Sequence, residues 1–339
     1  MAVKLIECVV NFSEGRDIEV INKIASEIIR TPGVKLLDID VSLDANRSVM
    51  SFIGKPEKVT DAAFKAIRKS LDLIDMRKHK GLHPRIGAAD VCPFIPLKNI
   101  SIGETIDIAH KFAKRVGEQL MIPVYCYGEA ALKANRVDIS NIRHGQYEEL
   151  ELKLQNPEWK PDFGPARFVP SAGATAIGAR DFLVAYNVNL DTTDDTIAKQ
   201  IAAEVRESGH LVQDVYGNLV RQPGTLKCVK AIGWFIKDFN KSQVSMNLQN
   251  TDITPLHKAF EEVKRLAKEK GVTVTGSEIV GLIHLDDMLA TGNFYKQLYS
   301  LNNVNSEVAL INTAISYLGL NDVRYFTSEK KIIEYAIDD

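Results

Sequence analysis

The segment His79–Asp90, HKGLHPRIGAAD, concentrates side chains that can carry out acid–base chemistry. Pro84 follows His83 directly and disfavours helical backbone angles there, and Gly81 and Gly87 add conformational freedom on either side. We therefore predict a shaped loop. Because histidine titrates nearest physiological pH, His83 can act as a proton carrier. The alternative reading is an ordinary surface loop that happens to contain histidines.

Other chemistries find less support in the sequence. His79 and His83 are four residues apart, but Gly81 lies between them and no third ligand is near in sequence. Metal sites need three or four ligands, so we predict no metal. The chain contains no phosphate-binding glycine loop and no G-x-S-x-G motif. Cys92 lies in an apolar run, which lowers thiol reactivity.

Carboxylates and arginines occur close to this loop in the sequence. Asp38 and Asp40 share one face of a predicted strand, Arg47 begins the next strand, and Arg85 and Asp90 belong to the loop itself. These side chains could orient and tune an imidazole. Taken alone, Asp38 and Asp40 favour the other interpretation, a solvated sheet face.

The composition is that of a globular protein with about two domains, since the chain has 339 residues, 45% hydrophobic and 25% charged. A formal net charge of −2 gives no indication of nucleic acid or an anionic membrane as a partner. No apolar run reaches the roughly 20 residues of a membrane span. Four cysteines without a C-x-x-C pair favour a reducing, cytoplasmic location.

Strand and helix patterns alternate, and the order repeats. CVVNFSEGRD corresponds to YNVNLDTTDD, and ANRSVMSFIG corresponds to NKSQVSMNLQ. Each half reads β-α-β-β-α-β, so we predict an α+β fold with two ferredoxin-like subdomains, at residues 1–178 and 179–339. Asn156–Ala176 is rich in proline and glycine and is interpreted as a linker or functional loop between them.

Several long motifs resemble one known family. ECVVNFSEGRD, LLDIDVSLDANRSVMSFIG, HKGLHPRIGAADVCPFIP, PVYCYGEAA and the EWKPDFGP–FVPS–GAT stretch together resemble the formiminotransferase domain over nearly the whole chain. In the animal enzymes this domain is fused to a cyclodeaminase domain, and we expect this chain to be the stand-alone transferase.

The resemblance implies a function and a set of site residues. The expected reaction moves the formimino group between N-formimino-L-glutamate and the co-substrate tetrahydrofolate, in histidine degradation, and the expected state is a homodimer. The histidine before proline, His83, corresponds to the catalytic residue. The loop from Gly164 to Gly173 corresponds to the folate contacts, although Ala172 stands where the family pattern has a larger residue such as tryptophan. The folate-binding residues implied are Gly164, Pro165, Phe168, Val169, Pro170, Ser171 and Gly173.

Proximity to the motif adds three further candidates. Asp40 could face the cationic amidine, and Arg47 or Arg85 could hold a carboxylate of either substrate. We expect folate to bind where the two halves meet. Two other functions remain open from the sequence: a glutamate formyltransferase that uses 5-formyltetrahydrofolate, and a non-catalytic folate-binding module that serves a separate cyclodeaminase.

Overall fold

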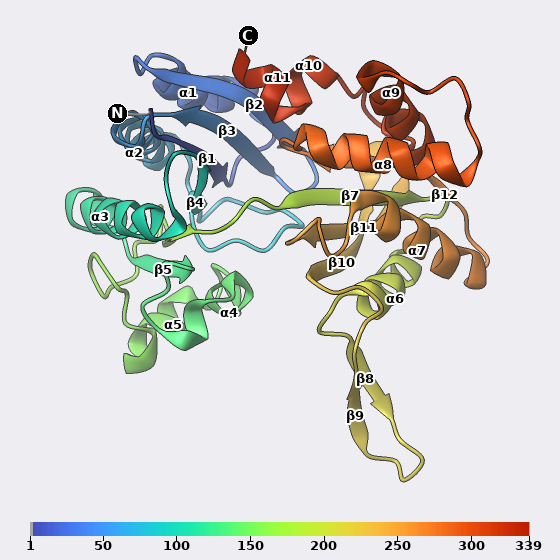
Figure 1. Ribbon diagram of the computed structural model, residues 1–339. Coiled ribbons are helices and arrows are strands. Elements are labelled where there is room, and N and C mark those ends of the chain that lie inside the picture. Colours follow the sequence, from blue (N-terminus) through green and yellow to red (C-terminus); the bar gives the residue numbers. More distant parts are fainter. Residues whose placement is uncertain (1–2, 339) are drawn as a thin grey trace. The chain divides into compact units, whose positions relative to one another are not determined.

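The computed structural model describes residues 3–338, and these divide into two compact units, residues 3–181 and residues 182–338 (Figure 1). The predicted α+β fold with a duplicated unit is confirmed, because each unit contains a β-α-β-β-α-β core. None of the helices in residues 3–338 is long and apolar enough to cross a membrane.

Unit 1 is built on a six-stranded sheet with the order β2-β3-β1-β4-β6-β5. Strands β2, β3, β1 and β4 pair in antiparallel fashion, whereas β6 pairs in parallel with both β4 and β5. The strands are β1 (Leu5–Phe12), β2 (Val34–Ser42), β3 (Arg47–Gly54), β4 (Ala89–Lys98), β5 (Val124–Gly128) and β6 (Thr175–Ala179).

The helices of unit 1 begin where the sequence provides caps. Asp17 caps the first with bonds from the Glu19 and Val20 amides, and Ser101 and Glu104 form a capping box. The helices are α1 (Ile18–Ile29), α2 (Pro56–Leu73), α3 (Ile102–Leu120), α4 (Ile139–Arg143) and α5 (Leu150–Gln155), with 3-10 turns η1 (Ala134–Arg136) and η2 (Pro157–Trp159).

Unit 2 repeats the core sheet with the order β10-β11-β7-β12 and adds a separate hairpin. Its strands are β7 (Val184–Leu190), β8 (His210–Gln213), β9 (Leu219–Gln222), β10 (Val229–Ile236), β11 (Lys241–Leu248) and β12 (Val274–Val280). Its helices are α6 (Asp195–Val205), α7 (Leu256–Glu269), α8 (Leu285–Leu298), α9 (Glu307–Leu318), α10 (Ser328–Lys331) and α11 (Ile333–Asp338), with the 3-10 turn η3 (Lys237–Phe239).

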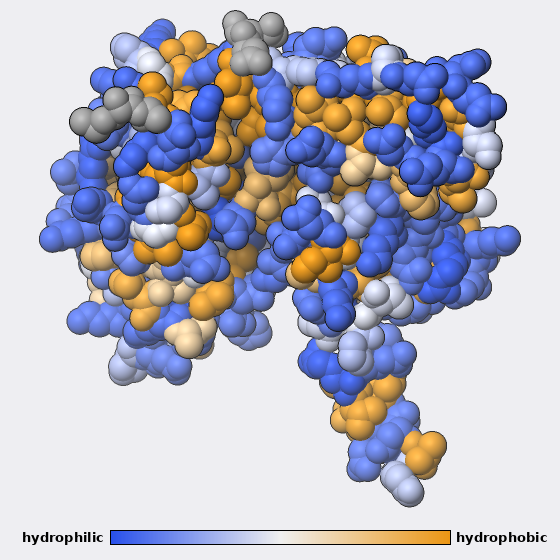
Figure 2. All heavy atoms as spheres, viewed as in Figure 1, coloured by the Kyte–Doolittle hydropathy of each residue, from blue (hydrophilic) through white to orange (hydrophobic). Residues whose placement is uncertain are grey.

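The β8–β9 hairpin was not predicted from the sequence. It extends away from the sheet of unit 2 and displays hydrophobic side chains on its surface (Figures 1 and 2). Val215 and Tyr216 at its turn are 92% and 86% exposed. Its strands have only four residues each, too short for a clear alternation of apolar and polar positions.

In unit 1, α1, α2 and α3 pack against one face of the sheet, and α4 and α5 pack against part of the other face, over β4, β5 and β6. In unit 1, Cys8, Val10 and Phe12 of β1 pack with residues of α1, α2 and α3 in a single core. Because side chains alternate along a strand, Val9 and Asn11 lie on the opposite face. In unit 2 the core contains residues of β7, α6, α7, α8 and α9.

The linker interpretation of Asn156–Ala176 is wrong. Thr175 begins β6, which lies between β4 and β5 in the sheet, and unit 1 continues to Asp181. The segment is therefore a loop within unit 1 that leads into an internal strand. Two of its glycines, Gly164 and Gly173, stand where the loop backbone closely approaches other backbone, as described below.

Candidate active site

His83 lies in an irregular loop, half-buried, between α2 and β4. Its Nδ1 is 2.8 Å from the carbonyl oxygen of Pro84. Because a carbonyl oxygen only accepts hydrogen bonds, Nδ1 carries the proton and donates it. The lone pair of the neutral imidazole is therefore on Nε2, which makes Nε2 the basic atom.

The surroundings keep the His83 imidazole neutral. Burial, followed by the positive charges of Arg47 and Arg143, lowers the pKa of His83 well below its ordinary value, while Asp90 and the Pro84 carbonyl act in the opposite direction. A base must be unprotonated to accept a proton. His83 is therefore in the form that a general base requires at neutral pH.

Two arginines share the buried carboxylate of Asp90. Arg47 Nη1 donates to Asp90 Oδ2 at 2.8 Å, and Arg143 Nη2 donates to the same oxygen at 2.5 Å. The other oxygen, Oδ1, accepts the amide of Ile86 at 2.9 Å. Although burial alone would raise it, Arg143 and Arg47 hold the pKa of Asp90 below its ordinary value. Asp90 thus ties the His83 loop to β3 and to α4.

The position of Arg47 is fixed from a second side. Its Nε and Nη2 donate to Asn11 Oδ1 on β1 at 3.1 and 2.6 Å. Asp40 lies on the edge strand β2 opposite Val49, and Val49 pairs with Asn11, so Asp40 and Asn11 share the sheet face that lies opposite α1, α2 and α3. Burial lowers the pKa of Arg47 to about 10, and Asp90 opposes that shift.

Arg85 is committed to contacts within the protein. Its guanidinium forms a bidentate pair with Glu148, with Nη1 and Nη2 each 2.7 Å from a carboxylate oxygen. It also donates to the Gln146 amide oxygen at 3.3 Å, to His79 Nδ1 at 3.1 Å and to the His79 carbonyl at 3.3 Å. These contacts engage all five of its N–H groups.

His79 anchors the start of the loop. Its Nε2 lies 2.8 Å from the carbonyl of Asn46, and its Nδ1 accepts from Arg85. Asn46 also accepts the Gly15 amide and donates to the Lys80 carbonyl. Burial lowers the pKa of His79, consistent with a neutral ring held between two fixed partners.

The second half of the Gly164–Gly173 loop lies directly against the His83 loop. The Ala88 amide donates to the Ala172 carbonyl at 2.8 Å, and Gly87 and Gly173 form an isolated bridge. Gly173 has φ of +71°, and a Cβ there would be 2.1 Å from the Ile86 carbonyl oxygen. Only glycine fits this close approach.

The remaining predicted folate residues divide between two places. The Ser171 carbonyl accepts the Met76 amide at 2.9 Å, and the Pro170 carbonyl accepts the Tyr147 hydroxyl at 2.6 Å. Phe168 packs 5.5 Å from the Tyr147 ring, and Val169 contacts the unit 1 core.

Gly164, with Pro165 after it, lies elsewhere. A Cβ on Gly164 would be 2.1 Å from the Ile122 carbonyl oxygen, and it would also be in tight contact with the backbone of Gly117. The structure thus brings Phe168–Gly173 toward the His83 loop and places Gly164 against the end of α3.

A segment that sequence reasoning missed connects these parts. Arg143 binds Asp90, Gln146 and Glu148 bind Arg85, and the Tyr147 amide donates to the Arg85 carbonyl at 2.9 Å. The stretch RHGQYEE carries these side chains some 60 residues after the loop in the chain. Its density of polar residues around a glycine was the available signal, but nothing local paired it with His83.

Among residues 3–338, no three histidine, cysteine, aspartate or glutamate side chains are grouped in a way that could hold a metal ion. The fold and site define a duplicated α+β protein with a neutral imidazole beside paired arginines. Family comparison agrees: the formiminotransferase domain, N-terminal subdomain, matches residues 5–180, and the formiminotransferase domain matches residues 185–338. The chain belongs to the formiminotransferase domain family.

The relatives fall into two groups, one of about the same length as this chain and one that is longer. The chain is 43% identical to a glutamate formimidoyltransferase of Thermoplasma acidophilum, over 89% of this chain and 96% of the relative. It is 46% identical to the formimidoyltransferase-cyclodeaminase of Gallus gallus, over 98% of this chain and 60% of the relative. It is 44% identical to the formimidoyltransferase-cyclodeaminase of Dictyostelium discoideum, over 99% of this chain and 61% of the relative. The chain thus spans about three fifths of these longer relatives.

Proposed function

We propose that the protein is a transferase that moves a formimino group from N-formimino-L-glutamate to tetrahydrofolate, giving 5-formiminotetrahydrofolate and L-glutamate. Family membership supports the class of reaction, and two relatives at 39% and 43% identity are named glutamate formimidoyltransferases. The observation that carries the proposal is the fixed imidazole of His83, whose Nδ1 is bound to the Pro84 carbonyl.

The chemistry requires a group that first accepts and then donates a proton. N5 of tetrahydrofolate attacks the amidine carbon, a C–N bond forms, and N5 becomes cationic. His83 Nε2 removes the N5 proton and passes a proton to the glutamate nitrogen. The bond from the carbon to that nitrogen then breaks, and glutamate leaves as a neutral amine. A single imidazole serves as base and then as acid.

The neighbouring residues take supporting roles in this proposal. Asp40 is the carboxylate that stabilises the cationic amidine, acting from the sheet face that it shares with Asn11. Arg47 orients Asp90. Arg85 holds the His83 loop on the Gln146–Glu148 segment, since its donors are already engaged.

Folate contacts are proposed for the loop that carries Gly164, Pro165, Phe168, Val169, Pro170, Ser171 and Gly173. The part beside the His83 loop, Phe168–Gly173, is held by backbone bonds on both sides. A backbone fixed in this way can present amide and carbonyl groups to a flat ring without reorganising. The buried Ala172 places only a methyl group at its position in the loop.

Three wider proposals accompany the reaction. A separate cyclodeaminase would consume the product, because both activities are named together in the longer relatives. The protein would act as a homodimer. It would work in the cytoplasm, where the reduced pair Cys8 and Cys92, with sulfur atoms 3.5 Å apart, would remain reduced.

The experiment compares donors with purified protein. Tetrahydrofolate is mixed with N-formimino-L-glutamate in one reaction, and 5-formyltetrahydrofolate is mixed with L-glutamate in another. We expect 5-formiminotetrahydrofolate in the first and far slower turnover in the second. Faster formyl transfer would make the protein a formyltransferase. Folate binding without turnover in either reaction would make it a binding module.

A further inference from the structure

Three arginines surround the His83 loop, and they differ in how many of their N–H groups are occupied. Arg85 uses all five, and Arg47 uses three, two toward Asn11 and one toward Asp90. Within residues 3–338 the Arg143 guanidinium makes a single hydrogen bond, to Asp90. Its Nε is buried and has no partner there. Arg143 therefore retains most of its donors for another acceptor.

The charges around Asp90 do not balance. Arg47 and Arg143 are 10% and 14% exposed, Asp90 is 0% exposed, and the ion pairs of the described residues give both cations the same single carboxylate. Arg85 is balanced separately by Glu148. A surplus positive charge in a mostly buried place is costly without a counter-ion. An anionic ligand would supply that counter-ion.

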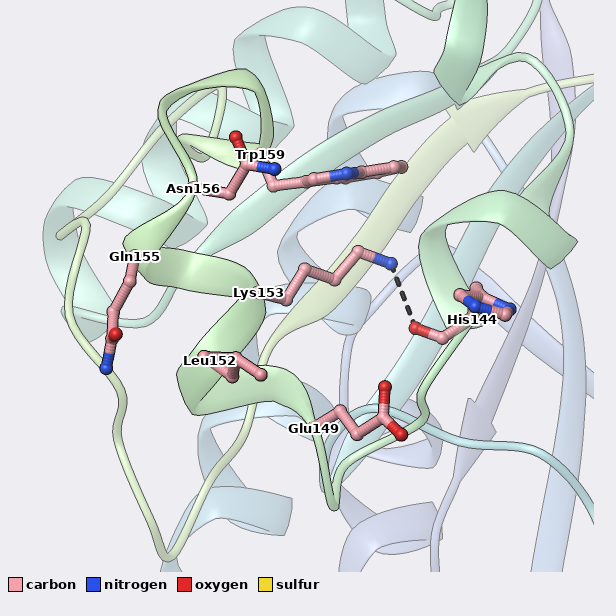
Figure 3. A pocket seen from close by; sticks show the side chains of 7 residues that line it. All are labelled: His144, Glu149, Leu152, Lys153, Gln155, Asn156 and Trp159. Atoms are coloured by element: carbon pink, nitrogen blue, oxygen red, sulfur yellow. Dashed lines mark hydrogen bonds between the residues drawn. The ribbon is translucent and has the colours of Figure 1, made fainter.

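The backbone that carries Arg143 is held firmly. Arg143 is the last residue of α4, and Lys153 Nζ donates to the carbonyls of Asn141 and Ile142 at 2.8 and 2.7 Å. It also donates to the His144 carbonyl at 3.1 Å (Figure 3). Lys153 also lies 3.9 Å from the centre of the Trp159 ring. A fixed backbone limits the orientations of the guanidinium, which suits recognition of a planar carboxylate.

We propose that Arg143 binds the α-carboxylate of N-formimino-L-glutamate and thereby selects an α-amino acid as the formimino donor. This inference rests on the proposed function. His83 must reach the α-nitrogen, because that nitrogen leaves. The α-carboxylate is attached to the next carbon, whereas the γ-carboxylate is two methylene groups further away. Arg143 and the His83 loop both bind Asp90, so Arg143 lies near His83. Of the two carboxylates, Arg143 therefore binds the α-carboxylate.

The test compares three donors with the wild type, Arg143→Gln and Arg143→Lys. They are N-formimino-L-glutamate, N-formimino-4-aminobutyrate without the α-carboxylate, and N-formimino-L-2-aminobutyrate without the γ-carboxylate. Loss of a charged hydrogen-bonded pair should lower kcat/KM of Arg143→Gln about 10- to 150-fold for the two donors that keep the α-carboxylate. For N-formimino-4-aminobutyrate the loss should be below about threefold. Arg143→Lys should recover part of the activity, and the KM for tetrahydrofolate should be unchanged.

A matched control uses another arginine of unit 1. Arg115 lies on α3, outside the His83 loop, and within the described part of the chain it also makes one ion pair, with Asp61 at 2.8 Å. Arg115→Gln should leave the ratio among the three donors unchanged. If Arg143→Gln lowers kcat/KM equally for all three donors, Arg143 only supports the structure and the proposal is overturned.

A binding measurement separates this inference from the proposed function. Calorimetric titration of L-glutamate and of 4-aminobutyrate into the wild type and Arg143→Gln requires no turnover. Binding of glutamate that is stronger than that of 4-aminobutyrate, and that weakens only in Arg143→Gln, supports the carboxylate site even if no formimino group is transferred. Transfer by the wild type with glutamate binding unaffected by Arg143→Gln would refute the site and leave the proposed function intact.

Discussion

The sheet face that carries Asn11 in unit 1 and the face that carries Asn189 in unit 2 have similar residues at corresponding positions. Asn11 on β1 corresponds to Asn189 on β7, and Arg47 at the start of β3 corresponds to Lys241 at the start of β11. The residue before each cation is an asparagine with positive φ, 47° at Asn46 and 50° in its counterpart. Duplication has therefore preserved the hairpin turn, its left-handed residue and the cation that follows.

The two faces differ in what surrounds the cation. In unit 2, Lys241 binds Asp322, which comes from the loop after α9 and also accepts from Asn189 and Thr275. In unit 1 the carboxylate is Asp90, which has a second arginine and lies beside a histidine loop. One carboxylate for one cation makes a structural contact. One carboxylate for two cations, next to a base, makes a site that can bind an anion and move a proton.

The first way to break this comparison removes the base. His83→Ala should lower kcat about 10²- to 10⁴-fold, because general acid–base catalysis contributes that much, while tetrahydrofolate affinity changes little. Steady-state kinetics and folate titration measure both. His79→Ala should be milder, since His79 anchors the loop through Asn46 and Arg85. Equal losses in the two variants, or near-normal turnover of His83→Ala, would contradict the assignment.

The second way compares the two carboxylates. Asp90→Asn leaves two mostly buried guanidiniums without a counter-ion and should reduce the free energy of unfolding by about 3–5 kcal/mol. Asp322→Asn removes the partner of Lys241, and both side chains are partly exposed, at 16% and 23%, so about 1–2 kcal/mol is expected. Urea denaturation followed by circular dichroism measures the two values. If Asp322→Asn reduced the free energy of unfolding more than Asp90→Asn, the proposed difference between the two carboxylates would be wrong.

The order of elements was predictable from sequence. The alternation of strand and helix patterns, repeated in the two halves, predicted the duplicated β-α-β-β-α-β unit that both sheets show. Strand β6 was missed because it is short and follows a segment whose prolines and glycines favour loops. Local sequence patterns depend on residues that are adjacent in the chain. Strand β6 is defined instead by its parallel pairing with β4 and β5, which are distant from it in sequence.

The candidate site was predictable only in part. His83 was proposed as a candidate because its proline, glycines and arginine are adjacent in sequence. Arg143 and Glu148 were not, because their partners Asp90 and Arg85 lie more than 50 residues away. Arg85 was predicted to bind a substrate carboxylate because the sequence shows its positive charge. The sequence does not show that Glu148 pairs with that charge.

The third prediction concerns pH. Burial and the charges of Arg47 and Arg143 lower the pKa of His83, so its folded-state value lies below the unfolded value of about 6.5. In the pH profile of kcat/KM, the midpoint of the acid limb should therefore lie below pH 6.5. Arg143→Gln removes a positive charge and should shift this midpoint to higher pH. Below about pH 6.5 the unfolded state binds the proton first, so His83 reduces stability as pH falls. A limb above pH 7 in the wild type would contradict this environment.

The fourth prediction concerns coupled protection. Because Ala88 and Gly87 are joined by backbone contacts to Ala172 and Gly173, tetrahydrofolate bound at this loop should slow amide exchange in both segments together. It should also raise the midpoint of thermal unfolding, since a ligand that binds only the folded state stabilises it. Exchange measured by mass spectrometry tests this. Protection of one segment alone would place folate elsewhere.

The smallest expected effect is that of a chelator. If the difference between the two faces lies in an imidazole and a surplus arginine, turnover should depend on protons and charge and not on a bound ion. Both nitrogens of His79 already have partners, Asn46 and Arg85, so this ring cannot join His83 as a ligand without losing them. Dialysis against a chelator should therefore leave kcat within error of the untreated enzyme. A stoichiometric metal found by elemental analysis, together with activity that disappears on its removal and returns on its addition, would show that the comparison omits an essential component.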